Sequence, residues 1–132
     1  MTKQISTNII LRNRTNGNLK SLTLNFRKQI VQRITTNFLD ILVLRLIQAE
    51  PIWGYKIIKE TERLFGIKLR HGALYPLLNT LEKKGYTKSK KTPTGGRIRK
   101  VYTITQKGGK LVDAYHEVLK EQLQKLDLKN KA

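Results

Sequence analysis

Residues 70–91 constrain the fold most, because the spacing of their side chains changes from that of a helix to that of a strand. Steps of three and four residues put one apolar stripe on a single helical face, namely Leu74, Leu77, Leu78 and Leu81. Gly85 is typical of the residue that follows a helix C-terminus. The pattern predicts a helix that begins near Gly72 and stops at Gly85, with a polar and cationic opposite face.

A period of two follows the helix. The alternating runs 86–91 and 97–105 predict two β-strands, and Pro93-Thr94-Gly95-Gly96 between them predicts a turn or flexible tip. Alone, such a cationic tip would be an ordinary exposed turn. Directly after a helix with a basic face, it indicates a wing.

The charge of the chain is strongly positive and unevenly distributed. There are 27 Lys and Arg against nine Asp and Glu, which gives a formal net charge of +18. Acidic residues are missing from residues 1–39 and 83–112. Clustered cations favour a polyanionic partner, since binding releases counterions from phosphates. A merely solvated basic surface is the alternative, and the clustering argues against it.

Other functional classes find little support. The chain has no cysteine, and His71 and His116 lie far apart, so we expect no metal site. Neither a Ser-His-Asp grouping nor a phosphate-cradling glycine loop is found, so we expect no catalytic residues and no cofactor. Apolar runs fall short of the roughly 18 residues of a membrane span, and the first residues are unlike a secretory signal. We expect a cytoplasmic, nucleoid-associated protein with no membrane partner.

The N-terminal part allows two interpretations. Leu22, Leu24 and Phe26 alternate after the Asn16-Gly17 turn signal, as in a hairpin. A fourfold spacing persists longer and favours a helix over residues 19–34, through Leu22, Phe26, Ile30 and Ile34. We expect residues 1–18 to be a basic, disordered arm, which either contacts phosphates or has no role.

Two helices precede the central one. Asn37 with Asp40 resembles a capping box, and the apolar residues after it predict a buried helix that Pro51 ends. Residues 55–65 predict the next helix, which Gly66 terminates. Its inward side chains would be Ile57, Ile58 and Leu64. The short connector to Arg70 has the spacing of a helix-turn-helix.

Trp53, just before this second helix, could stack on a ligand. We favour a partly buried anchor at the turn.

The last element is an amphipathic helix over residues 106–129. Its stripe and flanks predict a dimerisation surface formed by Leu111, Val112, Tyr115, Val118, Leu119, Gln122, Leu123 and Leu126. A helix beyond the hairpin has little core left to cover, so we expect it to pack against a second copy. The alternative is that it folds back on the first helices of its own chain.

These elements contain a set of residues that is typical of a known protein family. Residues 38–105 resemble the PadR family of winged-helix transcriptional regulators. The matching residues are Leu39 with Ile41-Leu42-Val43-Leu44, Gly54-Tyr55, Gly72 with Leu74-Tyr75-Pro76 and Leu78, Leu81-Glu82, Gly85, Gly95-Gly96-Arg97, Arg99-Lys100, Tyr102, and Thr105 with Gly108. Single pieces are weak, but the set is specific.

The resemblance implies a mainly α fold with a small β-hairpin wing. It comprises a winged helix-turn-helix with N-terminal and C-terminal dimerisation helices. Residues 1–18 would be the arm, 19–105 the first helix and DNA-binding domain, and 106–132 the dimerisation helix. The resemblance also makes Pro76 normal inside the third helix of the core.

The chain departs from the family in two places. Arg70-His71 stands where the family often has Ser or Thr followed by Pro, which removes a capping hydroxyl and adds a cation. The final helix lacks tryptophan and offers only Tyr115 to a flat aromatic molecule, so a small-molecule effector is possible but unsupported.

The expected DNA-facing residues belong to three elements and have different roles. Asn79 suits adenine and Arg70 suits guanine. The lysines would contact phosphates, and Arg97 would enter a minor groove. Arg99 and Lys100 alternate along a strand, so both cannot face DNA. The full set is Tyr55, Arg70, His71, Gly72, Tyr75, Asn79, Lys83, Lys88, Lys90, Lys91, Arg97, Arg99 and Lys100.

Two hypotheses for function remain. The first is a sequence-specific regulator of transcription, expected to be a repressor, that binds double-stranded DNA as a homodimer on a pseudo-palindromic operator. The alternative is a non-specific, architectural nucleic-acid-binding protein.

Overall fold

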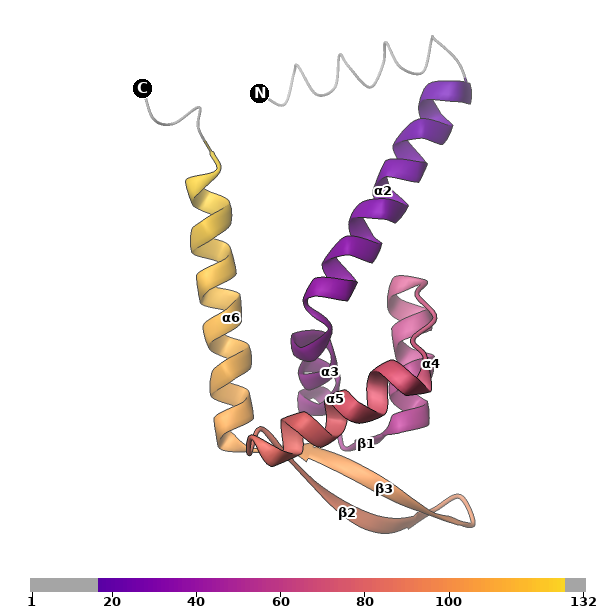
Figure 1. Ribbon diagram of the computed structural model, residues 1–132, viewed down its shortest axis with the longest axis vertical. Helices are drawn as coiled ribbons and strands as arrows, with labels where there is room; N and C mark the ends of the chain where they lie inside the picture. Colours follow the sequence, from indigo (N-terminus) through magenta and orange to yellow (C-terminus); the bar gives the residue numbers. More distant parts are fainter. Residues whose placement is uncertain (1–16, 128–132) are drawn as a thin grey trace. The chain divides into compact units, whose positions relative to one another are not determined.

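The computed structural model describes residues 17–127 of the chain (Figure 1). They fall into two compact units, of which the first ends at Asn37 and the second begins at Phe38. Most of the expected N-terminal arm lies outside the described residues. No helix within residues 17–127 is both long enough and apolar enough to cross a membrane.

The first unit contains one long helix, α2, over Gly17–Asn37. The helical interpretation of this segment is confirmed and the alternative hairpin is wrong. The stripe at fourfold spacing is about half exposed, with Leu22 at 46%, Phe26 at 53%, Ile30 at 54% and Ile34 at 53%.

The predicted cap at Asn37 is wrong. Asn37 is the last residue of α2, and its side-chain amide donates to the Arg33 carbonyl oxygen at 2.9 Å. The next helix begins at Leu39 after Phe38, without a side-chain cap. The Asp40 carboxylate accepts instead from the backbone N–H of Ile41 at 2.8 Å. The amide is thus used within the preceding helix, where it cannot cap the next.

The second unit is a winged helix-turn-helix, as the resemblance implied. Its helices are α3 (Leu39–Ala49), α4 (Gly54–Phe65), α5 (His71–Lys83) and α6 (Gln106–Lys125), and its strands are β1 (Ile52–Trp53), β2 (Thr87–Thr94) and β3 (Arg97–Ile104). The strands form one antiparallel sheet in the order β1-β3-β2. The two-residue strand β1 is an addition that the sequence did not predict.

One apolar core joins α3, α4, α5 and the sheet. Its fully buried side chains include Val43, Leu44, Ile47, Ile52, Ile57, Leu74 and Leu78. Leu64 is 49% exposed, so its predicted inward position is wrong. Leu64 lies two turns beyond Ile57 on α4, and the core of the unit does not extend that far.

The central helix begins and ends where the sequence indicated. Gly66 before α5 and Gly85 after it both have positive φ, 67° and 81°. Pro76 is the sixth residue of α5 and cannot donate to the carbonyl of Gly72 one turn earlier. Gly72 is exposed, so its carbonyl can bind water instead.

The wing is a tight hairpin. Gly95 and Gly96 form a two-residue loop with φ of 58° and 78°, the pair of positive angles that a type I′ turn requires. Pro93 is paired with Ile98 inside β2, so strand pairing extends further than the predicted turn allowed. A proline is tolerated there because β2 is the edge strand of the sheet.

A carboxylate ties the wing to α5. Glu82 lies 3.5 Å from the Lys100 ammonium and accepts a hydrogen bond from the Ser89 hydroxyl. The hydrogen bond from Ser89, and then Lys100, hold the pKa of Glu82 below its ordinary value. Electrostatic interaction with Tyr102, and then with Glu82, raises the pKa of the Lys100 ammonium. Both strands of the hairpin are thereby fixed to the C-terminal turn of the helix.

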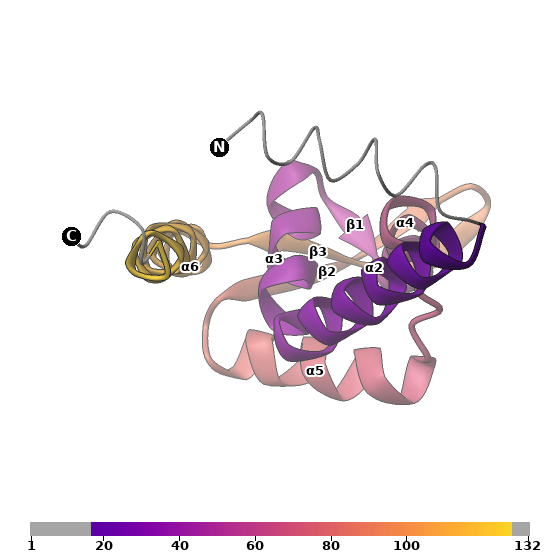
Figure 2. The same cartoon turned by 90° about the horizontal axis from the view of Figure 1, so that it is seen from above.

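The last helix starts against the end of the hairpin. Thr105 caps α6: its hydroxyl oxygen accepts from the Gly108 N–H at 3.1 Å, and the hydroxyl donates to the Gly85 carbonyl at 2.6 Å. In Figure 2 α6 is seen end-on beside α3, with which it packs. A Cβ at Gly108 would lie 2.1 Å from the Tyr86 carbonyl oxygen. The backbone of α6 at Gly108 is therefore in direct contact with the backbone at Tyr86.

We expect Gly108→Ala to lower the free energy of unfolding by about 3 kcal/mol, because the new methyl group forces α6 away from Tyr86. Gly109→Ala is the matched control, since its Cβ would find only the Gln48 amide at 3.8 Å. The control should be neutral or stabilising by up to about 1 kcal/mol. Urea unfolding at one protein concentration measures both, and equal midpoints for the two variants would contradict the contact.

We expect Glu82→Gln to destabilise the fold by about 0.5–1 kcal/mol at pH 7, a value reduced by solvent screening. The folded pKa of Glu82 is lowered, so its contribution is complete above the ordinary value of 4.5. The contribution disappears as the pH falls through the folded pKa. Thermal melts from pH 3 to 8 test this, with Glu117→Gln on α6 as the control. A difference that is constant over that range would refute the role of the charge.

Candidate nucleic-acid interface

The outward face of α5 is polar, as the sequence predicted. Leu74, Leu78 and Leu81 face the core, and the opposite face is exposed from the first turn to the last. The exposed residues are Arg70, His71, Gly72, Tyr75, Pro76, Asn79, Thr80 and Lys83. Every α5 residue named as DNA-facing is thus accessible. Thr80 lies on the same face, but its hydroxyl donates to the Pro76 carbonyl at 3.0 Å.

Two aromatic rings stand on the first turns of α5. His71 and Tyr75 are stacked, with ring centroids 5.5 Å apart and planes at 6°. The Tyr75 ring also crosses the start of α4, since a Cβ at Gly54 would lie 2.7 Å from its hydroxyl oxygen. Tyr75 nevertheless remains 40% exposed. Gly54 therefore lets the tyrosine hold the first turns of α4 and α5 together.

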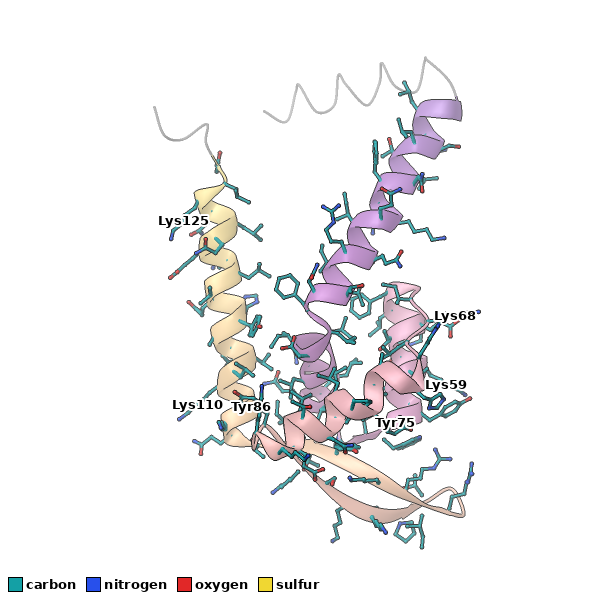
Figure 3. The ribbon with its side chains drawn as sticks, viewed as in Figure 1. Lys59, Lys68, Tyr75, Tyr86, Lys110 and Lys125 are labelled. Carbon is teal, nitrogen blue, oxygen red and sulfur yellow. The ribbon has the colours of Figure 1, made fainter. Side chains whose placement is uncertain are left out.

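Cations surround this end of the unit. The Lys59 ammonium lies 4.9 Å from the ring centroid of Tyr55, which is 49% exposed. Figure 3 shows Lys59 and Lys68 on the side of the unit where α5 begins. Neither lysine was among the residues predicted to face DNA. Lys59 follows Tyr55 by one helical turn, so helical spacing could have found it.

The strand register separates the cations of the wing into two sets. Residues that pair directly share a face, so Lys88, Lys90 and Arg99 lie on one face. Lys91 and Lys100 are paired with each other on the opposite face. The expected alternation of Arg99 and Lys100 is thus present.

Two of the wing cations are engaged within the protein. The Arg99 guanidinium lies 4.6 Å from the Trp53 ring centroid, and the Lys56 ammonium lies 5.3 Å from the same centroid. Trp53 is half-buried, which agrees with its interpretation as an anchor. Lys100 is held by Glu82. Arg99 and Lys100 therefore fix the wing, while Lys88, Lys90, Lys91 and Arg97 are exposed.

A second set of lysines lies where the C-terminal end of α5 is close to the start of α6. The Lys107 ammonium donates to the Lys84 carbonyl at 2.7 Å and lies 4.9 Å from the Tyr86 ring centroid. Figure 3 shows Tyr86 and Lys110 at this opposite end of the unit. Lys107 and Lys110 were not predicted to face DNA, because in the sequence each is an isolated charge on the final helix.

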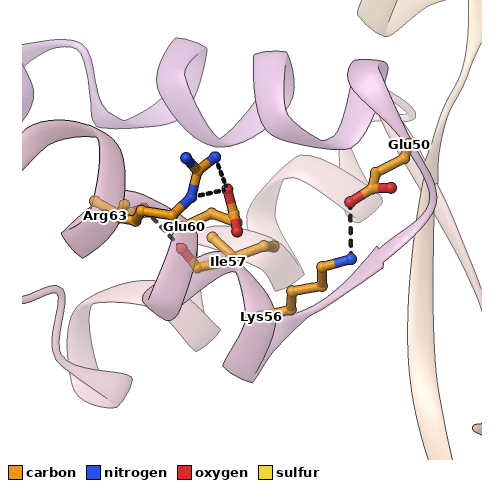
Figure 4. Close-up of polar contacts among 6 residues, drawn as sticks. Glu50, Lys56, Ile57, Glu60 and Arg63 are labelled. Atoms are coloured by element: carbon orange, nitrogen blue, oxygen red, sulfur yellow. Dashed lines mark hydrogen bonds and ion pairs between the residues drawn. The ribbon is translucent and has the colours of Figure 1, made fainter.

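Two acidic residues near α4, Glu50 and Glu60, form ion pairs with neighbouring cations. The Arg63 guanidinium lies 2.6 Å from the Glu60 carboxylate, and Lys56 lies 2.8 Å from Glu50 (Figure 4). The hydrogen bond from Arg63 lowers the pKa of Glu60. Within residues 17–127, no group of three or more His, Cys, Asp or Glu is arranged to hold a metal ion.

The expected dimer surface on α6 divides into two halves. Val112 is only 7% exposed and belongs to the core of its own unit, with Leu111 packed beside it. Tyr115 contacts Phe38 edge-on, with ring centroids 6.2 Å apart. Beyond them Val118, Leu119, Gln122, Leu123 and Leu126 are exposed. The first half of α6 thus packs on its own chain, and the second half presents an apolar stripe.

The fold is similar to that of solved PadR-like structures. A PadR-like transcriptional regulator from Bacillus cereus strain ATCC 14579 matches with a TM-score of 0.65 and 20% identity, over 76% of this chain and 98% of that chain. A PadR family regulator from Clostridium difficile R20291 matches with a TM-score of 0.62 and 23% identity, over 72% and 99%. At these identities the likeness concerns the fold.

A PadR family transcriptional regulator from Eggerthella lenta DSM 2243 is 28% identical, with a TM-score of 0.61, over 80% of this chain and 96% of that chain. No curated protein matches the chain in sequence. The model of the transcriptional regulator PadR-like family matches residues 43–114, which run from α3 into α6 and make up more than half of the chain. The chain therefore belongs to the PadR-like family of transcriptional regulators.

Proposed function

We propose that this protein is a cytoplasmic, nucleoid-associated repressor that binds a specific double-stranded DNA operator as a homodimer. The observation that carries the proposal is the exposed polar face of α5 together with a basic wing. The tip of the wing lies at the end of the unit where α5 begins (Figure 1). The segment from Lys83 to Val112 contains no acidic residue to oppose a phosphate backbone.

In this proposal α5 lies in the major groove. Arg70 can donate to the O6 and N7 atoms of guanine, and the Asn79 amide can pair with adenine. Arg70 makes no side-chain cap on α5, and the N–H groups of His71 and Gly72 in its first turn would face a phosphate. Tyr55 and the exposed lysines of the wing would contact phosphates and set the register of the protein on the duplex.

The two apolar stripes support a dimer. The exposed side chains on the second half of α6, together with those on α2, form two helical surfaces of the kind that pairs of helices bury. Each such side chain contributes about 1.5–3 kcal/mol when it is fully buried. Two-fold symmetry would present two α5 helices to half-sites about one helical turn apart, and the bound dimer would block polymerase.

A small-molecule effector gains no support from α6. Tyr115 was the one aromatic residue available for such a ligand, and it packs against Phe38 in its own chain.

The first test separates base reading from phosphate contact. Selection from a random duplex pool supplies the operator, and titrations at fixed salt compare it with a scrambled duplex. We expect Arg70→Ala or Asn79→Ala to weaken operator binding by about 10–100-fold and to change scrambled binding little. Lys88→Ala should weaken both equally and reduce the salt slope by about one.

Lys120→Ala on α6 is the charge control and should bind like wild type. Equal affinity of wild type for operator and scrambled duplexes at the same salt would reject the specific regulator. It would favour the non-specific architectural protein instead.

The second test concerns the dimer. Leu123 is 59% exposed on the apolar stripe of α6, so Leu123→Asp should place a charge in the interface and convert the dimer to a monomer. Gln124→Asp adds the same charge to the opposite face of the helix and should leave the dimer intact. Sedimentation equilibrium measures both. A monomeric wild type, or a Leu123→Asp variant that remains dimeric, would contradict an α6 interface.

A further inference from the structure

The tip of the wing carries two apolar side chains that the core does not use. Ile98 is 74% exposed, and its register partner Pro93 on β2 is exposed as well. Both stand on the sheet face that reaches the core further along, where Tyr102 is 2% exposed. On that face Ser89 and Lys100 contact Glu82 of α5, and Lys100 lies two residues from Ile98 along β3.

A single exposed apolar residue is common on protein surfaces and does not by itself indicate a binding site. The residues around Ile98 and Pro93 do indicate one. Lys91 and Lys100 follow on the same face as the apolar pair, and Arg97 and Arg99 lie on the other face. Lys100 and Arg99 are engaged by Glu82 and Trp53, so the exposed cations beside the apolar pair are Lys91 on its own face and Arg97 on the other face.

The tip is also held in place. The type I′ turn at Gly95-Gly96 closes the hairpin, and the strands are paired up to Thr94 and Arg97. Glu82 and Trp53 fix the other end of the wing through Lys100 and Arg99. The hairpin projects beyond the helices of its unit (Figure 1). An apolar pair on such a support meets a partner without first losing much conformational freedom.

We propose that Ile98 and Pro93 form an apolar wedge that enters a DNA minor groove and favours A·T pairs there. This inference rests on the proposed DNA-binding function. A duplex suits the tip because phosphates line a narrow groove, and Lys91 and Arg97 lie next to the apolar pair where they could reach those phosphates. Apolar side chains are known minor-groove wedges in DNA-bending proteins.

The preference for A·T follows from the groove chemistry. A G·C pair places the guanine N2 amino group on the floor of the minor groove, whereas an A·T pair does not. Ile98 and the Pro93 ring offer that amino group no acceptor, so contact would bury an unsatisfied donor. Arg97, beside the wedge, is also drawn to the narrow groove of an A·T tract.

Base analogues give a direct test. In operator duplexes, A·T pairs outside the α5 contacts are replaced one position at a time by G·C, by inosine·C, or by 2,6-diaminopurine·T. Inosine·C lacks the minor-groove amino group, and diaminopurine·T has it. At the wing position, we expect wild type to bind A·T and inosine·C equally. It should lose about tenfold with G·C and with diaminopurine·T.

The variant Ile98→Thr keeps a β-branched strand residue and removes most of the apolar contact. Its discrimination between A·T and diaminopurine·T should fall from about tenfold to less than twofold. Lys91→Ala, from the same tip, is the matched control: it should weaken binding to all four duplexes alike and keep the tenfold ratio. Circular dichroism melts confirm that both variants are folded.

Three outcomes would contradict the apolar wedge and leave the proposed regulator intact. The first is a specific operator in which no position is sensitive to the N2 amino group. The other two are equal binding of inosine·C and G·C wherever these differ from A·T, and unchanged discrimination in Ile98→Thr. A failure of the proposed function looks different, because wild type would then not prefer its operator over a scrambled duplex at all. A tip that serves a protein partner or a membrane would give the first of these outcomes.

Discussion

The arrangement of the second unit depends on the burial of three leucines of α5. Leu74 and Leu78 are completely buried and Leu81 nearly so, and their burial fixes the rotation of the helix about its axis. Because successive residues turn by about 100°, this rotation also decides that Asn79 and Lys83 point away from the core. The surface available to a partner is thus a direct consequence of how the core packs. Tyr75 over Gly54 adds a second constraint, since it locks the first turns of α4 and α5 together.

Charge on this unit serves two separate purposes. Lys100 and Arg99 interact with other residues of the chain, Lys100 with Glu82 and Arg99 with the Trp53 ring. These contacts attach the wing to α5 and to the start of α4. Lys88, Lys90, Lys91 and Arg97 have their charge directed to solvent. A count of basic residues therefore overestimates the number of cations available to DNA. The contacts that each cation makes within the protein show whether it stabilises the fold or is available to a partner.

The sequence was sufficient for elements whose signal is local. Helical spacing gave α2, α4, α5 and α6, and alternation gave the hairpin, because each pattern depends on neighbours within a few residues. Features that depend on distant residues were missed. The two-residue strand β1 exists only because β3 pairs with it, and Arg99 is engaged only because Trp53 lies across the sheet. The wrong cap at Asn37 has a local cause, because α2 runs three residues beyond the end of its apolar stripe and includes Asn37. The exposed face of α5 could be predicted, whereas the roles of its residues toward DNA remain proposals.

The exposed apolar residues of the chain fall into two physical classes. On α2 and on the second half of α6 they recur at helical spacing over several turns, so a partner helix could cover them continuously. Ile98 and Pro93 are one isolated pair at the end of a hairpin, next to the exposed cations Lys91 and Arg97. A partner helix would gain little from so small a patch and would bury the neighbouring charges at a cost. A groove lined by phosphates leaves those charges paired and accepts a narrow apolar tip. The same hydrophobic side chains thus indicate a protein partner in one place and a nucleic acid in the other, and the surrounding charge makes the distinction.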